Sequence, residues 1–438
     1  MKVKRRKIIE ITIVFSALIA GNIYAQSVVK PDFRVDNAPS AAEAGEPAVQ
    51  ALLNSSFVVA WLDLRNYPWS KVIAKIYDQN GTLIRNEFQL DDGGSLYCAF
   101  DIGAGGMTTD SNGNFFLTFT WSNDYTILYG RLRKFLPNGD PAGPSVSTRE
   151  SGPTYSQVIQ VARGKNDKII ISYAAANTIY YRIFDNNLSA ITNSIQVNQT
   201  TSYGPTGLAA NAGGDFVVVW EMMDGPMMAR LYDSDGNPRG GEFGIEQGVS
   251  AGRDPRVAYN KQGNFCVVWW SELFESFMRV FDGNGNPLTD AYYLGPASAE
   301  SNEEYGPPAV EADDAGNFII AYEYSSDLTP KAVYGTILDP SGGVLSLFFP
   351  VSELGGGFGG GEWMTTDVAS LYGGQFAVAW RDGRNDPNGD IYAAIIQNTR
   401  WWLPEEDPIP AAGPMALALL AGALGWALRR RLHQSTRY

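Results

Sequence analysis

A short apolar pattern recurs along the chain and is its most regular feature. An aromatic or large apolar residue is followed four positions later by an aromatic residue, with mostly β-branched or small residues between them. The seven pairs, spaced 47 to 58 residues apart, are Phe57/Trp61, Phe115/Phe119, Ile169/Tyr173, Phe216/Trp220, Phe265/Trp269, Phe318/Tyr322 and Phe376/Trp380. Because the apolar positions run on without polar alternation, each segment predicts a β-strand that is covered on both faces.

Turn signals flank these segments at regular places. Gly-Asn or Gly-Asp precedes most copies, as at Gly113-Asn114, and a second turn such as Asp233-Ser234-Asp235-Gly236 follows. Asn-Gly and Asp-Gly sequences supply the positive φ that a tight hairpin turn requires. Each unit therefore predicts strand, tight turn, strand, longer loop, strand, tight turn and strand, which is one four-stranded antiparallel blade of a β-propeller.

The last strand of a unit has the pattern Xaa-Phe-Xaa-Leu or a close variant, as in Glu87–Leu90, Ser194–Val197 and Glu242–Ile245. The seventh unit lacks such a segment, but Asp32–Asp36 near the N-terminus matches it. We therefore expect an all-β, seven-bladed propeller over residues 26–400, in which an N-terminal strand completes blade seven and removes the open edge of the ring.

Both ends of the chain carry patterns typical of targeting segments. Residues 1–25 combine a basic start, an apolar stretch and Ile23-Tyr24-Ala25, which predicts a signal peptide cleaved by signal peptidase. Residues 401–410 form a Pro-rich linker, 411–428 an uncharged stretch long enough for a transmembrane helix, and 429–438 a basic tail. The basic tail predicts a cytoplasmic C-terminus, so the body would be exported.

The C-terminal pattern resembles the bacterial PEP-CTERM sorting tails and their relatives whose motif begins Ile-Pro. Ile409-Pro410 and the cluster Arg429, Arg430 and Arg431 carry the match, although the chain has no Pro-Glu-Pro. The resemblance implies recognition by an exosortase-like protease and a location in the cell envelope, anchored by the helix or released after processing. Residues 31–398 also resemble bacterial envelope β-propellers with Gly-Asn-Phe-Val-Val-Val-Trp units, which implies a binding or display platform.

Composition excludes several kinds of chemistry. The formal charge is −14 and nine of the 33 Lys and Arg residues lie in the two terminal clusters, so the acidic body argues against a nucleic-acid partner. The single histidine, His433, lies beyond the apolar stretch, which excludes Ser-His-Asp, Cys-His and zinc-hydrolase sites. We expect Cys98 and Cys266 to be buried thiols, and we expect no cofactor and no metal, because the Asp-rich segments recur as hairpin turns.

Candidate binding residues lie in the long loops. Antiparallel strand order places the loops between strands two and three on the same face as the loops that join successive blades. Aromatic residues and carboxylates interleave there with arginines, a combination that suits a glycan through ring stacking and hydroxyl hydrogen bonds. The candidates are Asp63, Arg65, Trp69, Glu221, Trp270, Glu272, Trp363, Arg381, Asp382 and Arg384.

The sequence thus predicts a non-catalytic module that binds an envelope polysaccharide or a partner protein on this long-loop face. Two alternatives stay open. A propeller glycosidase or lyase would need two carboxylates about 5 to 9.5 Å apart, and a structural component of an extracellular matrix would need no site. A pair of carboxylates converging at one mouth of the ring would favour the enzyme, whereas a flat aromatic rim would favour binding.

Overall fold

The computed structural model describes residues 24–400, apart from short segments in the connecting loops. These segments are 38–43, 67–68, 94–96, 99–104, 123–127, 153–158, 200, 223–224, 247, 249–251, 272, 274, 297–299, 301, 330, 354–364 and 386–388. Ala25–Thr399 form one compact unit. The predicted signal peptide, sorting motif, transmembrane helix and basic tail lie almost entirely outside the described residues. Within residues 24–400, no described helix has the length and apolar character that a membrane span needs.

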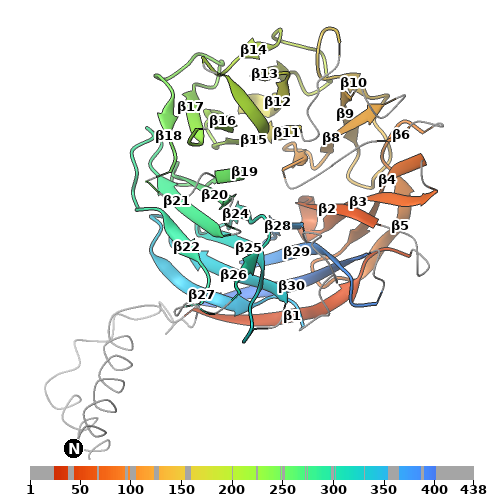
Figure 1. Cartoon of the computed structure of the whole chain (residues 1–438). Coiled ribbons are helices and arrows are strands. Elements are labelled where there is room, and N and C mark those ends of the chain that lie inside the picture. The colour runs from red at the N-terminus through yellow and green to blue at the C-terminus, as the bar shows by residue number, and fades with distance from the viewer. Residues whose placement is uncertain are drawn as a thin grey trace, which may run out of the picture. The chain divides into compact units, whose positions relative to one another are not determined.

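Seven antiparallel sheets are arranged radially around a central axis, so the fold is the expected seven-bladed β-propeller (Figure 1). Blades one to three are β2 (Ala44–Ala51), β3 (Phe57–Asn66), β4 (Trp69–Tyr77) and β5 (Leu83–Gln89); β6 (Tyr97–Cys98), β7 (Met107–Thr109), β8 (Phe115–Ser122), β9 (Tyr129–Phe135) and β10 (Val146–Ser147); and β11 (Gln160–Arg163), β12 (Ile169–Ala175), β13 (Thr178–Phe184) and β14 (Ile195–Gln196). Short 3-10 helices, η1 (Leu53–Ser55) and η2 (Lys165–Asp167), follow β2 and β11.

The remaining four blades follow the same order from the axis outward. They are β15 (Ser202–Ala210), β16 (Phe216–Met222), β17 (Met228–Tyr232) and β18 (Phe243–Gly244); β19 (Gly252–Tyr259), β20 (Phe265–Ser271), β21 (Ser276–Phe281) and β22 (Tyr292–Leu294); β23 (Glu304–Tyr305), β24 (Ala309–Ala312), β25 (Phe318–Ser325), β26 (Ala332–Leu338) and β27 (Val344–Pro350); and β28 (Thr366–Ser370), β29 (Gln375–Asp382), β30 (Asp390–Arg400) and β1 (Tyr24–Arg34). The last of these, blade seven, therefore joins the two ends of the propeller.

The seven aromatic pairs lie on the second strand of each blade, as the periodicity predicts. Each pair is buried; Phe57 and Trp61, for example, are 0% and 1% exposed. Side chains from neighbouring blades meet there in seven hydrophobic clusters, each shared by two adjacent blades among the described residues. The core is therefore a ring of interfaces between sheets, and the space around the axis is left for other side chains.

The Asp-Gly segments are hairpin turns, which confirms the turn prediction. In the turn that begins at Asp233, the Oδ1 atom accepts hydrogen bonds from the backbone N–H of Asp235 at 3.0 Å and of Asn237 at 2.8 Å. Gly236 has a φ of +88°, which an L residue rarely adopts. These turns and those between strands one and two lie on one face of the ring, the turn face. The longer loops lie on the opposite, long-loop face.

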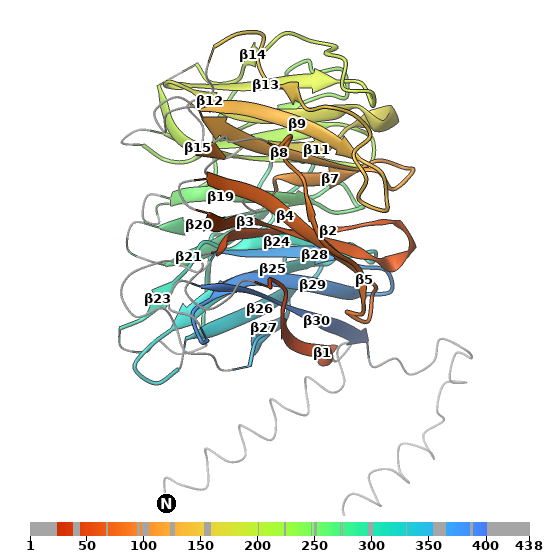
Figure 2. The same cartoon turned by 90° about the vertical axis from the view of Figure 1, so that its right-hand side faces the viewer.

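The N-terminal strand closes the ring. β1 pairs with β30 at the outer edge of blade seven, and the two run side by side in both views (Figures 1 and 2). The Val35 N–H donates to the Ile391 carbonyl at 2.7 Å. Arg34 Nη2 lies 2.8 Å from Asp36 Oδ1 and 2.7 Å from Asp390 Oδ1. The predicted closure by Asp32–Asp36 is thus confirmed, and the strand begins earlier than the sequence pattern indicates.

An arginine on the third strand ties several blades to their predecessors. Arg279 of β21 donates from Nε to the Thr289 carbonyl at 3.0 Å and from Nη1 to the Ile245 carbonyl of the preceding blade at 2.9 Å. Arg133, Arg182 and Arg230 make the corresponding pair of bonds in blades two, three and four. A guanidinium is suited to this because its fixed fork reaches two carbonyl oxygens at once.

Candidate functional site

A cavity of about 380 Å³ occupies the centre of the ring. All seven inner strands line it, and its lining continues to Gly164, Ala212 and Lys261, where strand one passes into the turn on the turn face. Small residues make up much of the wall because neighbouring inner strands approach closely. A Cβ atom on Gly207, for example, would lie 2.9 Å from the Pro255 carbonyl oxygen of the next blade. Larger polar side chains therefore stand out in this ring.

Two carboxylates from neighbouring blades line this cavity. Glu311 of β24 accepts a hydrogen bond from the Ala312 N–H at 2.9 Å. Asp367 of β28 is 7% exposed and accepts bonds from the N–H of Val368 at 2.9 Å and of Val49, in blade one, at 2.8 Å. Burial raises the pKa of each carboxyl to about 7. Glu311 raises the pKa of Asp367 further, whereas Arg256 opposes the rise, so the three charges act on one another.

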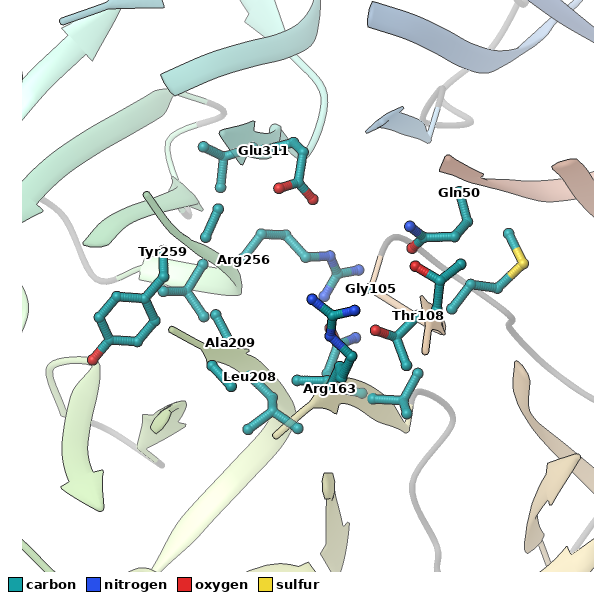
Figure 3. A pocket seen from close by; sticks show the side chains of 18 of the residues that line it. Gln50, Gly105, Thr108, Arg163, Leu208, Ala209, Arg256, Tyr259 and Glu311 are labelled. Carbon is teal, nitrogen blue, oxygen red and sulfur yellow. The ribbon is translucent and has the colours of Figure 1, made fainter. Parts of the chain in front are cut away.

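Two guanidinium groups reach into the same cavity. Arg163 lies at the end of β11 and Arg256 lies on β19, and Figure 3 shows both side chains directed toward the centre of the channel. The Nη1 atom of Arg256 is buried and has no hydrogen-bond partner among the described residues. The cavity thus brings together two arginines and two carboxylates from four blades, with Gln50 and Thr108 completing the polar lining.

None of these four charged residues was singled out from the sequence, although a signal exists for two of them. The strand registers place Arg256 and Asp367 at equivalent positions of blades five and seven, where blades one, four and six carry Ala48, Gly207 and Ala309. Where other repeats have Ala or Gly at a position, the fold does not need a charged residue there, so a charged residue at that position indicates another role. Comparing the inner strands with one another would have found it.

The predicted binding residues of blade one form an internal ion-pair chain. Asp63 is buried and accepts bonds from Arg65, from its backbone N–H at 3.1 Å and from its Nε atom at 2.7 Å. Arg65 Nη2 continues to Glu87 Oε2 at 3.1 Å, on the outer strand of the same blade. The hydrogen bond to Asp63 raises the pKa of Arg65. The loop between strands two and three is thereby tied to β5.

Blade seven repeats this arrangement. Asp382 is buried and accepts from Arg384 N at 2.8 Å and Nε at 2.7 Å, while Arg384 Nη1 lies 2.5 Å from Asp32 Oδ2 on the closing strand. The two sites share the sequence Trp-Xaa-Asp-Xaa-Arg-Asn, beginning at Trp61 and Trp380. The pattern is therefore a structural tie in both blades, and these acids and arginines already have partners within the fold.

The other predicted residues are scattered along the long-loop face. Trp270 donates from Nε1 to the Tyr305 carbonyl at 2.8 Å and packs against the cluster shared by blades five and six. Glu221 and Arg381 lie at the loop-side ends of β16 and β29, each partly exposed. Glu272, Trp363 and the side chain of Trp69 lie outside the described part. Their role in binding stays a prediction.

Cys266 is a buried free thiol, as expected, and burial raises its pKa, while the side chain of Cys98 is not described. Among the residues that the structure describes, no three His, Cys, Asp or Glu side chains are grouped so that they could hold a metal ion.

No protein-family model and no curated protein matches this sequence. Solved structures do match it in fold. A protein of unknown function from Dyadobacter fermentans has a TM-score of 0.52 at 12% identity, covering 85% of this chain and 99% of its own. A fungal alcohol oxidase in complex with copper gives 0.51 at 11% identity, covering 86% and 77%. An ulvan lyase from a new polysaccharide lyase family gives 0.50 at 11% identity, covering 84% and 95%. At this identity the likeness extends to the fold alone, and the chain is similar to these proteins as a β-propeller.

Proposed function

We propose that the protein is a non-catalytic carbohydrate-binding module and that its ligand enters the central cavity. The observation that carries the proposal is the cavity itself, at about 380 Å³, into which side chains of all seven blades converge. That volume lies within the range of small-molecule sites, and its lining is mainly polar. Amide and hydroxyl groups such as those of Gln50, Thr108 and Gln160 are hydrogen-bond partners that sugar hydroxyls need.

The cavity and the long-loop face are two different locations for the ligand, and one experiment separates them. The propeller over residues 26–400 is screened against a glycan array, and affinity for any positive glycan is measured by calorimetry. We expect a channel variant with Gln50→Ala and Thr108→Val to lose affinity. A loop-face variant with Trp69, Trp270 and Trp363 changed to Ala should keep it. Loss in the loop-face variant alone would place binding on the loops and overturn the channel proposal.

A polysaccharide-cleaving enzyme is the second candidate function, favoured by the carboxylates Glu311 and Asp367. A carboxyl with a pKa near 7 is partly protonated at neutral pH, as a general acid must be. Asp367, however, uses both oxygens to accept backbone N–H groups, which suits a structural tie between blades better than attack on a sugar. Release of reducing ends from a bound glycan, lost in Glu311→Gln, would establish the enzyme; bound glycan recovered intact would support the module.

We further propose that the module works at the cell envelope, exported through signal peptidase and held by residues 411–428 or released by an exosortase-like protease. The support is the sequence pattern at the two ends. A chain that stops at Arg400 should fractionate as a soluble, folded protein, whereas the full chain should sediment with membranes. If the shortened form stayed membrane-bound after a high-salt wash, the anchor assignment would be wrong.

A further inference from the structure

We propose that the central cavity is built for an anionic group and that Arg163 and Arg256 bind the carboxylate of an acidic saccharide, such as a uronic acid residue. This inference rests on the proposed carbohydrate-binding function and names its ligand class. Arg163 comes from β11 in blade three and Arg256 from β19 in blade five, and both point into the channel (Figure 3). Two blades thus present a cation to the same space.

The state of the two guanidinium groups carries the argument. Neither Arg163, which is exposed, nor Arg256, which is partly buried, forms an ion pair with a residue that the structure describes. Of the two, Arg256 has the buried donor without a hydrogen-bond partner, its Nη1 atom. A buried donor that lacks an acceptor costs free energy, about 1–3 kcal/mol and more for a charged group. A ligand oxygen at this place would remove that cost.

Other arginines of the propeller contrast with this pair. Arg182 and Arg279 donate to backbone carbonyls, while Arg65 and Arg384 are paired with carboxylates. In those places the fold itself supplies the acceptors. The channel pair lacks such acceptors within the described part, which is the condition expected of a ligand-binding cation.

The charge of the residues that line the channel favours an anionic ligand. Arg163 from β11 and Arg256 from β19 are the cations of the channel, and Lys261 in the following turn donates from Nζ to the Asp314 carbonyl at 2.7 Å. Glu311 from β24 and Asp367 from β28 are the acids. The inner strands β2, β7 and β15 add only uncharged groups to the lining. Both acids have a pKa of about 7, so near and below neutral pH the cations outweigh them. The planar fork of a guanidinium group matches the two oxygens of a carboxylate.

The test measures binding of a galacturonic acid oligomer by calorimetry at pH 6, with a galactose oligomer of equal length as the neutral arm and a sulfated galactose oligomer as the second anionic arm. We expect the uronate to bind the parent chain. Arg256→Gln and the double variant with Arg163→Gln should each weaken it at least about tenfold. Arg85→Gln, on the outer strand β5, is the matched control and should bind like the parent. Tighter binding of the sulfated arm than of the uronate would overturn the carboxylate assignment.

The pH dependence of binding gives a second readout, taken at protein concentrations where both proteins stay folded. Affinity for the uronate should fall as pH rises from 5.5 to 8.5, because Glu311 and Asp367 ionise across that range and repel the ligand. Glu311→Gln should bind more tightly at pH 8.5 and show a flatter profile. An affinity independent of pH in both proteins, or unchanged affinity in the double arginine variant, would overturn the inference.

Failure of the inference and failure of the proposed function give different results. If the neutral oligomer binds as tightly as the uronate, carbohydrate binding stands and the anion assignment falls. If no saccharide binds, inorganic sulfate is the remaining probe. A rise in melting temperature with sulfate in the parent, absent from the double arginine variant, would keep the anion site and reject the carbohydrate function. No rise would reject both.

Discussion

Arginines on the third strand show how single residues hold the blades together. Arg279 is 8% exposed, and its two bonds reach one carbonyl of its own blade and one of the blade before it. Its guanidinium also lies over the Phe281 ring, 5.3 Å from the centroid. A residue of this kind links two sheets, because one guanidinium group donates charge-assisted hydrogen bonds to a carbonyl oxygen of each blade.

Replacing Arg279 by Met tests this role. The change keeps the aliphatic stem but leaves the carbonyls of Ile245 and Thr289 without their donor, so the free energy of unfolding should fall by about 2–4 kcal/mol. Urea denaturation followed by fluorescence measures it. Arg85→Met, which removes an exposed pair with Asp140, should cost less than about 0.5 kcal/mol. Equal losses in the two variants would contradict the assignment.

The channel acid Glu311 makes stability depend on pH. Its pKa rises from 4.5 in the unfolded chain to about 7 in the fold because of burial. Between these values the folded protein holds a proton that the unfolded chain has lost, so this contribution to stability is complete below pH 4.5 and is lost as pH rises through 7. Because the side chain keeps some access to the channel, we expect about 1–2 kcal/mol.

Glu311→Gln should make the profile less steep and leave the contribution of Asp367, whose pKa is also raised to about 7, since an amide does not titrate and its oxygen can still accept from Ala312. Urea midpoints at pH 4.5, 6 and 8 for parent and variant give the comparison. Parallel curves across this range would show that Glu311 is not the titrating group.

Hairpin turns set the geometry of each blade at the scale of elements. The Asp233 turn joins β17 to the outer strand, and Gly236 packs against blade three, where Tyr181 Oη donates to its carbonyl at 2.6 Å. A Cβ atom at Gly236 would lie 2.9 Å from the same Tyr181 oxygen, at a φ of +88°. This turn therefore both reverses the chain and contacts the neighbouring blade.

Gly236→Ala should lower stability by about 1–2 kcal/mol through the strained φ and the close oxygen. Gly241→Ala, five residues on in open space and without a positive φ, is the matched control and should be neutral or slightly stabilising. Thermal unfolding by circular dichroism compares them. A loss at Gly241 as large as that at Gly236 would mean that the turn conformation is not the cause.

The strands and turns were predictable from the sequence because every blade needs the same kinds of residue at the same positions. Buried second strands need apolar residues at most positions, so Phe216 to Trp220 and its six counterparts look alike, and Gly at positive φ recurs in the turns. The inner strands are different. Pro47, Pro205 and Pro255 lie where β2, β15 and β19 shift register against their partners. Because of this irregularity, the ends of these inner strands cannot be read from the hydrophobic pattern.

The site was much less predictable, for a physical reason. Loop residues such as Asp382 and Arg384 were predicted to bind a ligand because charged and aromatic groups cluster there, and the sequence did not show that the two pair with each other. Arg163 and Arg256 lie 93 positions apart and meet because two inner strands point to one axis. The sequence does not show that these two residues line the same cavity until the number of blades and the strand register are known.

At the scale of the whole molecule, stability depends on a closed ring. Each hydrophobic cluster is shared by two blades, and the one between blades seven and one includes Val35 next to the closing strand. Without β1, the outer edge of β30 would be unpaired and that interface weakened.

Deleting residues 31–37 should therefore lower the melting temperature by several degrees and promote aggregation. Differential scanning calorimetry and light scattering measure the two effects. The deletion removes the Arg34 and Asp36 contacts with Asp390 and Ile391 as well as the strand pairing. A deleted protein that melts like the parent and stays monodisperse would show that the ring does not need this strand.

The pairing of the first strand with the last also means that the ring can close only after nearly the whole propeller has been synthesised. Arg34 and Asp390 are 356 positions apart, and a ribosome adding about 5–20 residues per second needs roughly 20 to 70 seconds to pass from one to the other. Until then β1 has no strand to pair with, because β30 is its only neighbour in the sheet of blade seven. Completion of the fold is thereby tied to completion of the chain.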